Sequence, residues 1–224
     1  MKNIVVVIPA YNEEKTIGKV VLQVITAGFK NVVVVDDGSK DATAERARAV
    51  GAMVYSHPTN CGVGAATVTG FAVAKKLGAD LIVTLDADEQ HIATEITDVI
   101  KPIINDEADL VIGSRFLKEN KIPVLRILYN KIGNIISFAL SGVRLNDSQS
   151  GFRAFSRCAL DKIEITMPNY EFWIEVNREV SQKSLRVKEV PIGVVYSEYS
   201  KSKGQSFSVG IDTLFRLIVR SLMR

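Results

Sequence analysis

Short apolar runs alternate with longer stretches of helical composition along the first half of the chain. The runs are rich in β-branched residues and flanked by turn residues, as is typical of buried parallel strands, and they span residues 4–8, 32–35, 53–55, 81–85 and 110–112. The stretches between them predict helices over residues 14–27, 42–50, 64–77 and 94–105. This alternation predicts an α/β fold with a doubly wound, mainly parallel sheet and helices on both faces.

The pattern changes after Gly113. Residues 122–143 predict a long helix, 152–155 a strand, 170–182 a helix and 187–195 a further strand. No repeat, low-complexity segment or linker divides the chain, so we expect one domain over residues 1–206. Residues 207–224 predict an additional C-terminal helix.

Composition narrows the class of protein. The 224 residues are 47% hydrophobic, which indicates a globular protein, and 28 basic against 25 acidic side chains leave a net charge of +3. That charge is too small for a protein that neutralises many phosphates of a duplex, so no nucleic-acid partner is expected. No apolar run reaches the roughly 18 residues that span a bilayer, and the first run is too short for a signal peptide. We therefore expect a cytoplasmic protein.

The two cysteines, Cys61 and Cys158, cannot form a four-ligand zinc site, because no closely spaced Cys or His pair supplies the remaining ligands. Both are predicted to be free, buried thiols, as expected in a reducing compartment.

Three predicted strands end in polar side chains at the edge where parallel strands bind ligands. The first ends at Pro9 and continues through Tyr11 to Glu13, a segment that could instead be a helix cap formed by Asn12. The second ends in Asp36 and Asp37, whose adjacent carboxylates repel each other. Asp37 could accept a hydrogen bond from a ribose hydroxyl or a base N–H; the alternative is an ordinary turn and helix cap.

The third strand, residues 81–85, is followed by Asp86, Asp88 and Gln90. Asp86 and Asp88 are separated by one residue, so in extended chain they can point to one side and share a hard cation, with Gln90 adding an oxygen. Mg²⁺ or Mn²⁺ fits this set, whereas His91 is better suited to capping or hydrogen bonding. A cation held by few carboxylates completes its shell with phosphate and water, which indicates a nucleotide diphosphate as ligand.

Two other phosphate-binding motifs are missing. The chain has no Gly-x-x-x-x-Gly-Lys-Ser/Thr sequence, which excludes a P-loop enzyme. The segment 62–67 lacks the third glycine of a dinucleotide-binding fingerprint and follows no long first strand.

Six motifs carry a family resemblance: 8–14 (IPAYNEE), 35–39 (VDDGS), 60–66 (NCGVGAA), 86–88 (DAD), 113–115 (GSR) and 150–153 (SGFR). In this order they resemble the motifs of the family 2 inverting glycosyltransferases, most of all the dolichol-phosphate mannose or glucose synthase branch. The resemblance covers residues 3 to 205. It implies the GT-A fold, which is Rossmann-like, a nucleotide-sugar donor and a polyprenyl phosphate acceptor.

The resemblance also implies roles for individual residues. Donor nucleotide contacts fall on Pro9, Tyr11, Glu13, Asp36, Asp37 and Gly62, and on Lys201 or Lys203 in a basic loop that closes on the diphosphate. Metal ligands fall on Asp86, Asp88 and Gln90, and acceptor-phosphate contacts on Arg115, Arg126 and Asn130.

Two positions depart from the family pattern. Val63 stands where lysine is usual, which removes a phosphate contact. Glu89 stands where glycine is usual, which adds negative charge beside the metal.

The acceptor decides which catalytic groups the reaction needs. A polyprenyl phosphate is mostly ionised at neutral pH, because its second pKa is about 6, so its oxygen attacks the anomeric carbon without a strong base. A hydroxyl acceptor would need a carboxylate base, for which Asp147 is the candidate; the alternative is that Asp147 is a structural turn carboxylate. More remote alternatives are a sugar-nucleotide-forming transferase and a non-catalytic nucleotide-binding protein.

Two segments predict peripheral binding at the cytoplasmic face of a membrane. The 207–224 helix would carry apolar side chains on one side and Arg216, Arg220 and Arg224 on the other. The 122–143 helix offers a second apolar surface beside the expected phosphate site. For the 207–224 helix the alternative is packing against the protein core, with its arginines facing water. Oligomeric state is not predicted.

Overall fold

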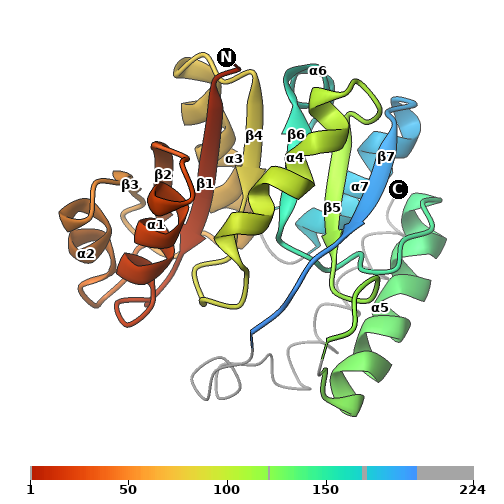
Figure 1. The fold of residues 1–224 in the computed structure, drawn as a ribbon, viewed down its shortest axis with the longest axis horizontal. Helices are drawn as coiled ribbons and strands as arrows, with labels where there is room; N and C mark the ends of the chain where they lie inside the picture. Colours follow the sequence, from red (N-terminus) through yellow and green to blue (C-terminus); the bar gives the residue numbers. More distant parts are fainter. Residues whose placement is uncertain (1, 121, 168–170, 196–224) are drawn as a thin grey trace.

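The computed structural model describes residues 2–120, 122–167 and 171–195, which form a seven-stranded sheet (Figure 1). The strands are β1 (Ile4–Ala10), β2 (Asn31–Asp36), β3 (Met53–Ser56), β4 (Leu81–Thr84), β5 (Leu110–Ser114), β6 (Arg153–Ser156) and β7 (Val187–Pro191). Their order across the sheet is β3-β2-β1-β4-β6-β5-β7. The predicted α/β fold with a mainly parallel sheet is confirmed.

Helices cover both faces of this sheet. One face carries α1 (Ile17–Thr26), α2 (Thr43–Ala49), the short 3₁₀ helix η1 (Ala93–Glu95) and α4 (Ile96–Ile104). The other carries α3 (Val63–Lys76), α6 (Arg157–Lys162) and α7 (Phe172–Gln182). The long helix α5 (Val124–Ser141) packs beside α7 and extends beyond the sheet layer (Figure 1).

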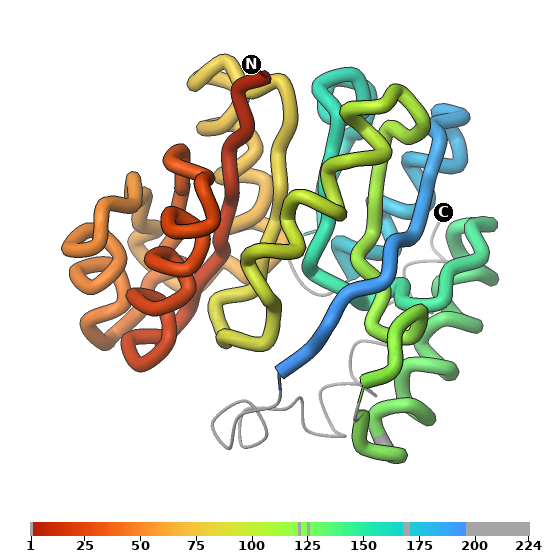
Figure 2. Tube along the Cα trace, in the orientation of Figure 1, coloured from red at the N-terminus to blue at the C-terminus, as the bar shows by residue number. Residues whose placement is uncertain are grey.

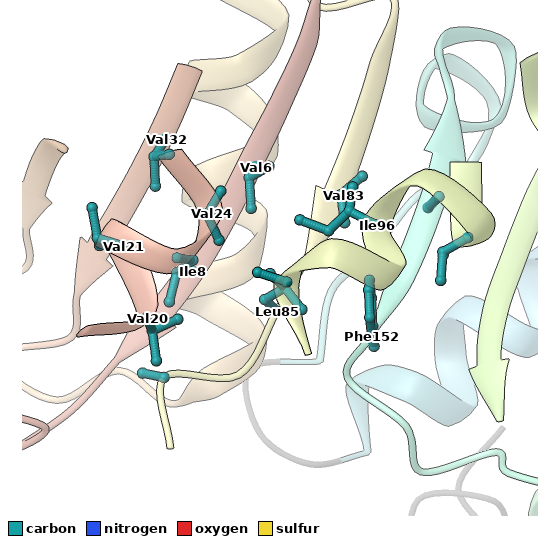
Figure 3. Packing of buried hydrophobic residues seen from close by; sticks show 14 of the residues in the cluster. Val6, Ile8, Val20, Val21, Val24, Val32, Val83, Leu85, Ile96 and Phe152 are labelled. Carbon is teal, nitrogen blue, oxygen red and sulfur yellow. The ribbon is translucent and has the colours of Figure 1, made fainter. Parts of the chain in front are cut away.

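The central strands β1, β2 and β4 carry continuous apolar runs, with polar residues only at the strand ends, and both of their faces are covered. In β1, Val6 and Ile8 point into the cluster under α1 and α4, while Val5 and Val7 point into the cluster under α3. Figure 3 shows the first cluster, in which Val20 and Val24 of α1 and Ile96 of α4 meet side chains of β1 and β4. This two-sided burial explains why these strands appear in the sequence as continuous apolar runs.

Strand β6 runs antiparallel to both of its neighbours, β4 and β5. Its first residue, Arg153, pairs with Thr84 at the end of β4. The segment that precedes β6 therefore lies at the edge where the parallel strands end, and the tube in Figure 2 follows the chain through this crossing. Residues 145–152 and the loop after β4 thus meet at one edge.

Most predicted elements are present with small shifts at their ends, and the 170–182 helix begins at Phe172. The prediction of buried thiols is wrong: Cys61 and Cys158 are free but exposed, Cys61 in the loop before α3 and Cys158 in the first turn of α6. The predicted 207–224 helix, together with Lys201 and Lys203, lies outside the described residues.

Candidate active site

The three predicted metal ligands lie in the loop that follows β4. Asp88 Oδ1 accepts the backbone N–H of Gln90 at 3.1 Å, and the Gln90 side-chain amide also donates to Asp88 Oδ2. His91 Nε2 lies 3.0 Å from Asp86 Oδ2, and the His91 side chain is only 5% exposed. His91 therefore supports Asp86 through a hydrogen bond, as the sequence indicated for this residue.

Gly151 allows Asp86 to occupy its position. A Cβ atom at Gly151 would lie 2.3 Å from Asp86 Oδ1, closer than real atoms approach. The Gly151 carbonyl accepts a hydrogen bond from the Thr84 hydroxyl at 2.7 Å, which ties the segment before β6 to the end of β4. A larger residue here would displace the Asp86 side chain, because the segment before β6 brings its backbone against the carboxylate.

The two carboxylates of the loop have opposite pKa shifts. Burial raises the pKa of Asp86. The hydrogen bond from His91 and the charge interactions with His91, Arg115 and Arg153 lower it by more, so the net pKa is below its usual value. Burial and the neighbouring Asp86 charge raise the pKa of Asp88. An ionised Asp88 therefore destabilises the folded chain at neutral pH.

These residues fit a hard divalent cation. Asp86, Asp88 and Gln90 offer oxygen atoms only, which is the donor set that Mg²⁺ and Mn²⁺ prefer. A cation would also relieve the repulsion that raises the pKa of Asp88.

Arg115 follows β5 and forms a forked ion pair with Asp147. Its Nε and Nη2 atoms donate to the two Asp147 oxygens at 2.7 Å each, and its backbone N–H donates to Oδ2 at 3.0 Å. Asn130 Nδ2 donates to Asp147 Oδ1 at 3.1 Å. Asp147 is completely buried and each of its oxygens accepts two hydrogen bonds, which fits the structural role that the sequence left open for it.

The segment around Asp147 is held from several elements. Glu189 of β7 accepts the backbone N–H groups of Asn146 and Asp147, and Asn134 of α5 accepts the N–H and hydroxyl of Ser148. This network fixes the backbone on which the ion pair with Arg115 depends.

Arg153 anchors the same segment from inside the protein. Its guanidinium is completely buried, donates to the carbonyls of Ser148 and Ser150 and to Asn177, and stacks 4.1 Å from the Trp173 ring. Burial lowers the pKa of Arg153 to about 9, so the guanidinium still carries its charge at neutral pH.

Arg126 connects helix α5 to the loop after β4, which carries the predicted metal ligands. Its Nη1 donates to Gln90 Oε1 at 3.4 Å, and its side chain is partly exposed. Arg126 and Asn130 are four residues apart and therefore lie on one face of α5, so the structure brings these two of the three predicted acceptor-phosphate residues to the edge that carries Asp86 and Asp88.

The loops after β1 and β2 are joined by hydrogen bonds. Asn12 accepts the backbone N–H of Lys40 at 2.9 Å, and its own N–H donates to the Ser39 hydroxyl at 2.9 Å. Asn12 therefore joins two loops and does not cap α1, whose N-cap is Thr16. Among the predicted donor residues nearby, Tyr11 is 41% exposed and Asp36 is buried. Pro9, at the end of β1, pairs with Val35 of β2.

Asp37 is buried and holds the start of α3. Its Oδ1 accepts the Cys61 N–H at 2.9 Å, and its Oδ2 accepts the Gly62 N–H at 2.8 Å. His57, after β3, lies 2.7 Å from Asp37 Oδ1 through Nδ1. The predicted donor residues Asp37 and Gly62 are therefore in direct contact.

Sequence reasoning gave no role to three residues that shape this edge: His57, Glu189 and Arg153, of which the last was quoted only as part of the 150–153 motif. His57 does carry a usable signal, because it follows a predicted strand just as Asp36 and Asp86 do. The other two lie within strands, where sequence pattern does not show which partners a polar side chain finds.

Comparison with known proteins agrees with this architecture. The family described as Glycosyl transferase family 2 matches residues 5–164. An uncharacterized protein of Methanocaldococcus jannaschii is 39% identical over 98% of this chain and 92% of its own length. A UDP-N-acetylglucosamine–dolichyl-phosphate N-acetylglucosaminyltransferase of Methanococcus voltae is 37% identical over 97% of this chain and 96% of its own length.

A more distant relative is a polyprenol monophosphomannose synthase of Mycolicibacterium smegmatis, 31% identical over 88% of this chain and 79% of its own length. Among solved structures, glucosyl-3-phosphoglycerate synthase from Mycobacterium tuberculosis, in complex with phosphoglyceric acid, has a TM-score of 0.69 and 25% identity. The match covers 88% of this chain and 72% of that one. These matches confirm the GT-A fold, and the chain belongs to the family 2 glycosyltransferases.

Proposed function

We propose that this glycosyltransferase moves a hexose from a nucleotide-diphospho-sugar, of the GDP-mannose or UDP-glucose type, to a polyprenyl phosphate with the help of a divalent cation. The observation that carries the proposal is the contact between Arg126 of α5 and Gln90, in the loop after β4 that carries Asp86 and Asp88. It puts a guanidinium suited to a phosphate beside the carboxylates suited to a cation. The names of two relatives, which act on dolichyl phosphate and polyprenol phosphate, support the same class of acceptor.

The geometry favours an acceptor that needs no base. Both oxygens of Asp147, the candidate base for a hydroxyl acceptor, are engaged by Arg115 and Asn130. An ionised lipid phosphate can attack the anomeric carbon directly, while Arg126 and Arg115 hold it in line. A cation bound at Asp86 and Asp88 would supply Lewis-acid stabilisation of the departing nucleoside diphosphate.

Helix α5 supports a lipid acceptor because its apolar side faces outward. Toward the protein it presents polar side chains, including Asn130 and Asn134, that bond to the segment around Asp147. On the outer side, five apolar side chains are 46–81% exposed; these form the α5 stripe, Val124, Leu128, Ile132, Ile135 and Phe138. Such a stripe is typical of a helix that contacts a partner or a membrane surface.

No described helix is both long and apolar enough to cross a bilayer. We propose that the α5 stripe rests on the membrane that contains the acceptor, with Arg126 and Asn130 facing the active site. The enzyme would then act as a peripheral protein at the cytoplasmic face of that membrane.

Replacing Asp88 by alanine is expected to abolish sugar transfer and to leave the fold intact. The carboxylate binds the cation but is repelled by Asp86, so its removal should keep or raise the melting temperature measured without divalent ions. Excess EDTA should stop the wild-type enzyme in the same way. Full transfer activity in EDTA would contradict the metal site.

Replacing Arg126 by alanine is expected to raise the KM for polyprenyl phosphate about tenfold or more, because a hydrogen bond to a charged group contributes about 1.5–3 kcal/mol. Nucleotide affinity measured by calorimetry should stay nearly unchanged, whereas Asp37→Ala should weaken it. Arg144→Ala is the control, since Arg144 is an exposed arginine just beyond α5. If Arg126→Ala lowers nucleotide affinity as much as Asp37→Ala does, this division of the site is wrong.

Replacing Asp147 by asparagine is expected to lower the free energy of unfolding by about 3 kcal/mol, because it leaves the partly buried Arg115 without its counter-charge. Asp161→Asn is the control: Asp161 pairs with Arg157 and Lys75 at the surface, so its loss should cost less than about 1 kcal/mol. Chemical denaturation measures both. Complete loss of transfer with unchanged stability would instead identify Asp147 as a catalytic base.

The double variant Leu128→Ser/Ile135→Ser is expected to reduce binding to anionic liposomes in a sedimentation assay, because it removes apolar area from the α5 stripe. Leu22→Ser/Ile104→Ser is the matched control, since these side chains of α1 and α4 are 54% and 48% exposed but lie away from α5. Equal liposome binding by both variants and the wild type would show that the α5 stripe does not contribute to membrane binding.

A further inference from the structure

Three side chains that can bind a metal meet where β2 and β3 end and α3 begins. Asp37 follows β2, His57 follows β3, and Cys61 precedes α3. A carboxylate oxygen of Asp37, a ring nitrogen of His57 and the Cys61 Sγ atom all lie within 4.8 Å of one another. The predicted metal ligands after β4 offer oxygen atoms, whereas this cluster offers oxygen, nitrogen and sulfur.

The backbone holds the thiol beside the carboxylate. The N–H groups of Cys61 and Gly62 donate to Asp37 at 2.9 and 2.8 Å. The Thr59 backbone packs against Gly38, where a Cβ atom would lie 2.5 Å from the Thr59 carbonyl carbon. Moving Cys61 away from Asp37 would therefore break several contacts at once, so the cluster is assembled before any cation binds.

His57 can present a ring nitrogen to a cation and keep its second partner. Its Nδ1 atom lies 2.7 Å from Asp37 Oδ1, and its Nε2 atom lies 2.9 Å from the hydroxyl of Thr69 in α3. A hydroxyl can both donate and accept a hydrogen bond. When Nδ1 binds a cation, the ring proton moves to Nε2 and is donated to Thr69, which is the outer hydrogen bond that ligating histidines usually make.

A zinc ion fits between these atoms after a small movement. Zn–N and Zn–O bonds of about 2.0–2.2 Å at the tetrahedral angle place ligand atoms about 3.4 Å apart. His57 Nδ1 and Asp37 Oδ1 would thus separate by about 0.7 Å from their hydrogen-bond distance. Cys61 is exposed, while the His57 and Asp37 side chains are 17% and 4% exposed. A cation therefore reaches the two inner ligands from the side of the thiol.

We propose that Asp37, His57 and Cys61 form a second cation site, which binds Zn²⁺ and is separate from the site at Asp86 and Asp88. Thiolate and imidazole ligands favour Zn²⁺, whereas Mg²⁺ and Mn²⁺ prefer oxygen. Binding releases the thiol proton of Cys61, and the two negative ligands balance the charge of the cation. Water completes the fourth position, as is usual for zinc with three protein ligands.

Zn²⁺ at this site competes with the donor nucleotide. Asp37 and Gly62 are predicted donor contacts, and a carboxylate that coordinates a cation is no longer available to the nucleotide. This consequence rests on the proposed function, because it takes Asp37 as a donor contact. The cation site itself does not depend on that function.

Cadmium tests the site directly, because it binds to zinc ligands and gives an ultraviolet thiolate-to-metal absorption band. Titration of the reduced full chain with Cd²⁺ should produce this band at one equivalent, and Zn²⁺ should remove it by competition. Cys61→Ser should lose the band, whereas Cys158→Ser, which changes the other exposed cysteine, should keep it.

His57→Gln separates a shared site from a thiol that binds alone. Its amide can still donate to Asp37 but lacks the ring nitrogen, so Cd²⁺ affinity should fall at least about tenfold, since even an outer partner of a ligand contributes that much. No band in the wild type, a band that survives in Cys61→Ser, or unchanged Cd²⁺ affinity in His57→Gln overturns the site.

Calorimetry with UDP and with GDP, in the presence of Mg²⁺, tests the competition. Zn²⁺ at about ten times its dissociation constant should weaken nucleotide binding about tenfold in the wild type and in Cys158→Ser, and little in Cys61→Ser. Complexes of Zn²⁺ with free nucleotide form equally in all three samples, so the difference reports the site. Equal weakening in Cys61→Ser overturns the competition. If neither nucleotide binds without Zn²⁺, the proposed function fails, while the Cd²⁺ titration still decides the cation site.

Discussion

The candidate active site, at the edge of the sheet where the parallel strands end, depends on the contact between the Gly151 backbone and the Asp86 carboxylate. It exists because β6 runs antiparallel between β4 and β5 and so begins where β4 ends. The segment that leads into β6 carries Asp147 and Ser148, while the loop after β4 carries Asp88 and Gln90. A single reversed strand thus joins the loop after β4 to the half of the chain that holds Arg115 and helix α5.

The same edge of the sheet holds two charged side chains in electrostatically unfavourable positions. Asp88 is kept beside Asp86 although this raises its pKa, while Arg153 remains buried although burial lowers its own pKa. The first cost suits a site completed by a cation. The second is offset by three side-chain hydrogen bonds and a stacked tryptophan that fix the segment before β6. Both features keep charged groups at this edge of the sheet.

Much of this arrangement could be predicted from sequence, because the strands are buried on both faces and end abruptly in acidic residues. The positions of Asp37, Asp86 and Asp88 followed from that pattern. The direction of β6 did not, since the side-chain pattern of a four-residue strand looks the same in either direction. The burial of Cys61 and Cys158 was predicted wrongly because cysteine is usually buried, whereas here both occupy outward positions. The partners of Asp147 depend on segments that are distant in the sequence.

The acceptor is the central claim, and a direct transfer assay tests it. Purified enzyme with Mn²⁺ and labelled UDP-glucose, UDP-N-acetylglucosamine or GDP-mannose would be given either a polyprenyl phosphate or the corresponding free polyprenol, and label would be counted in the extracted lipid. The account predicts labelled lipid with the phosphate and none with the alcohol, because Arg126 and Arg115 hold a phosphate and Asp147 is not available as a base. Equal transfer to the free alcohol would contradict it.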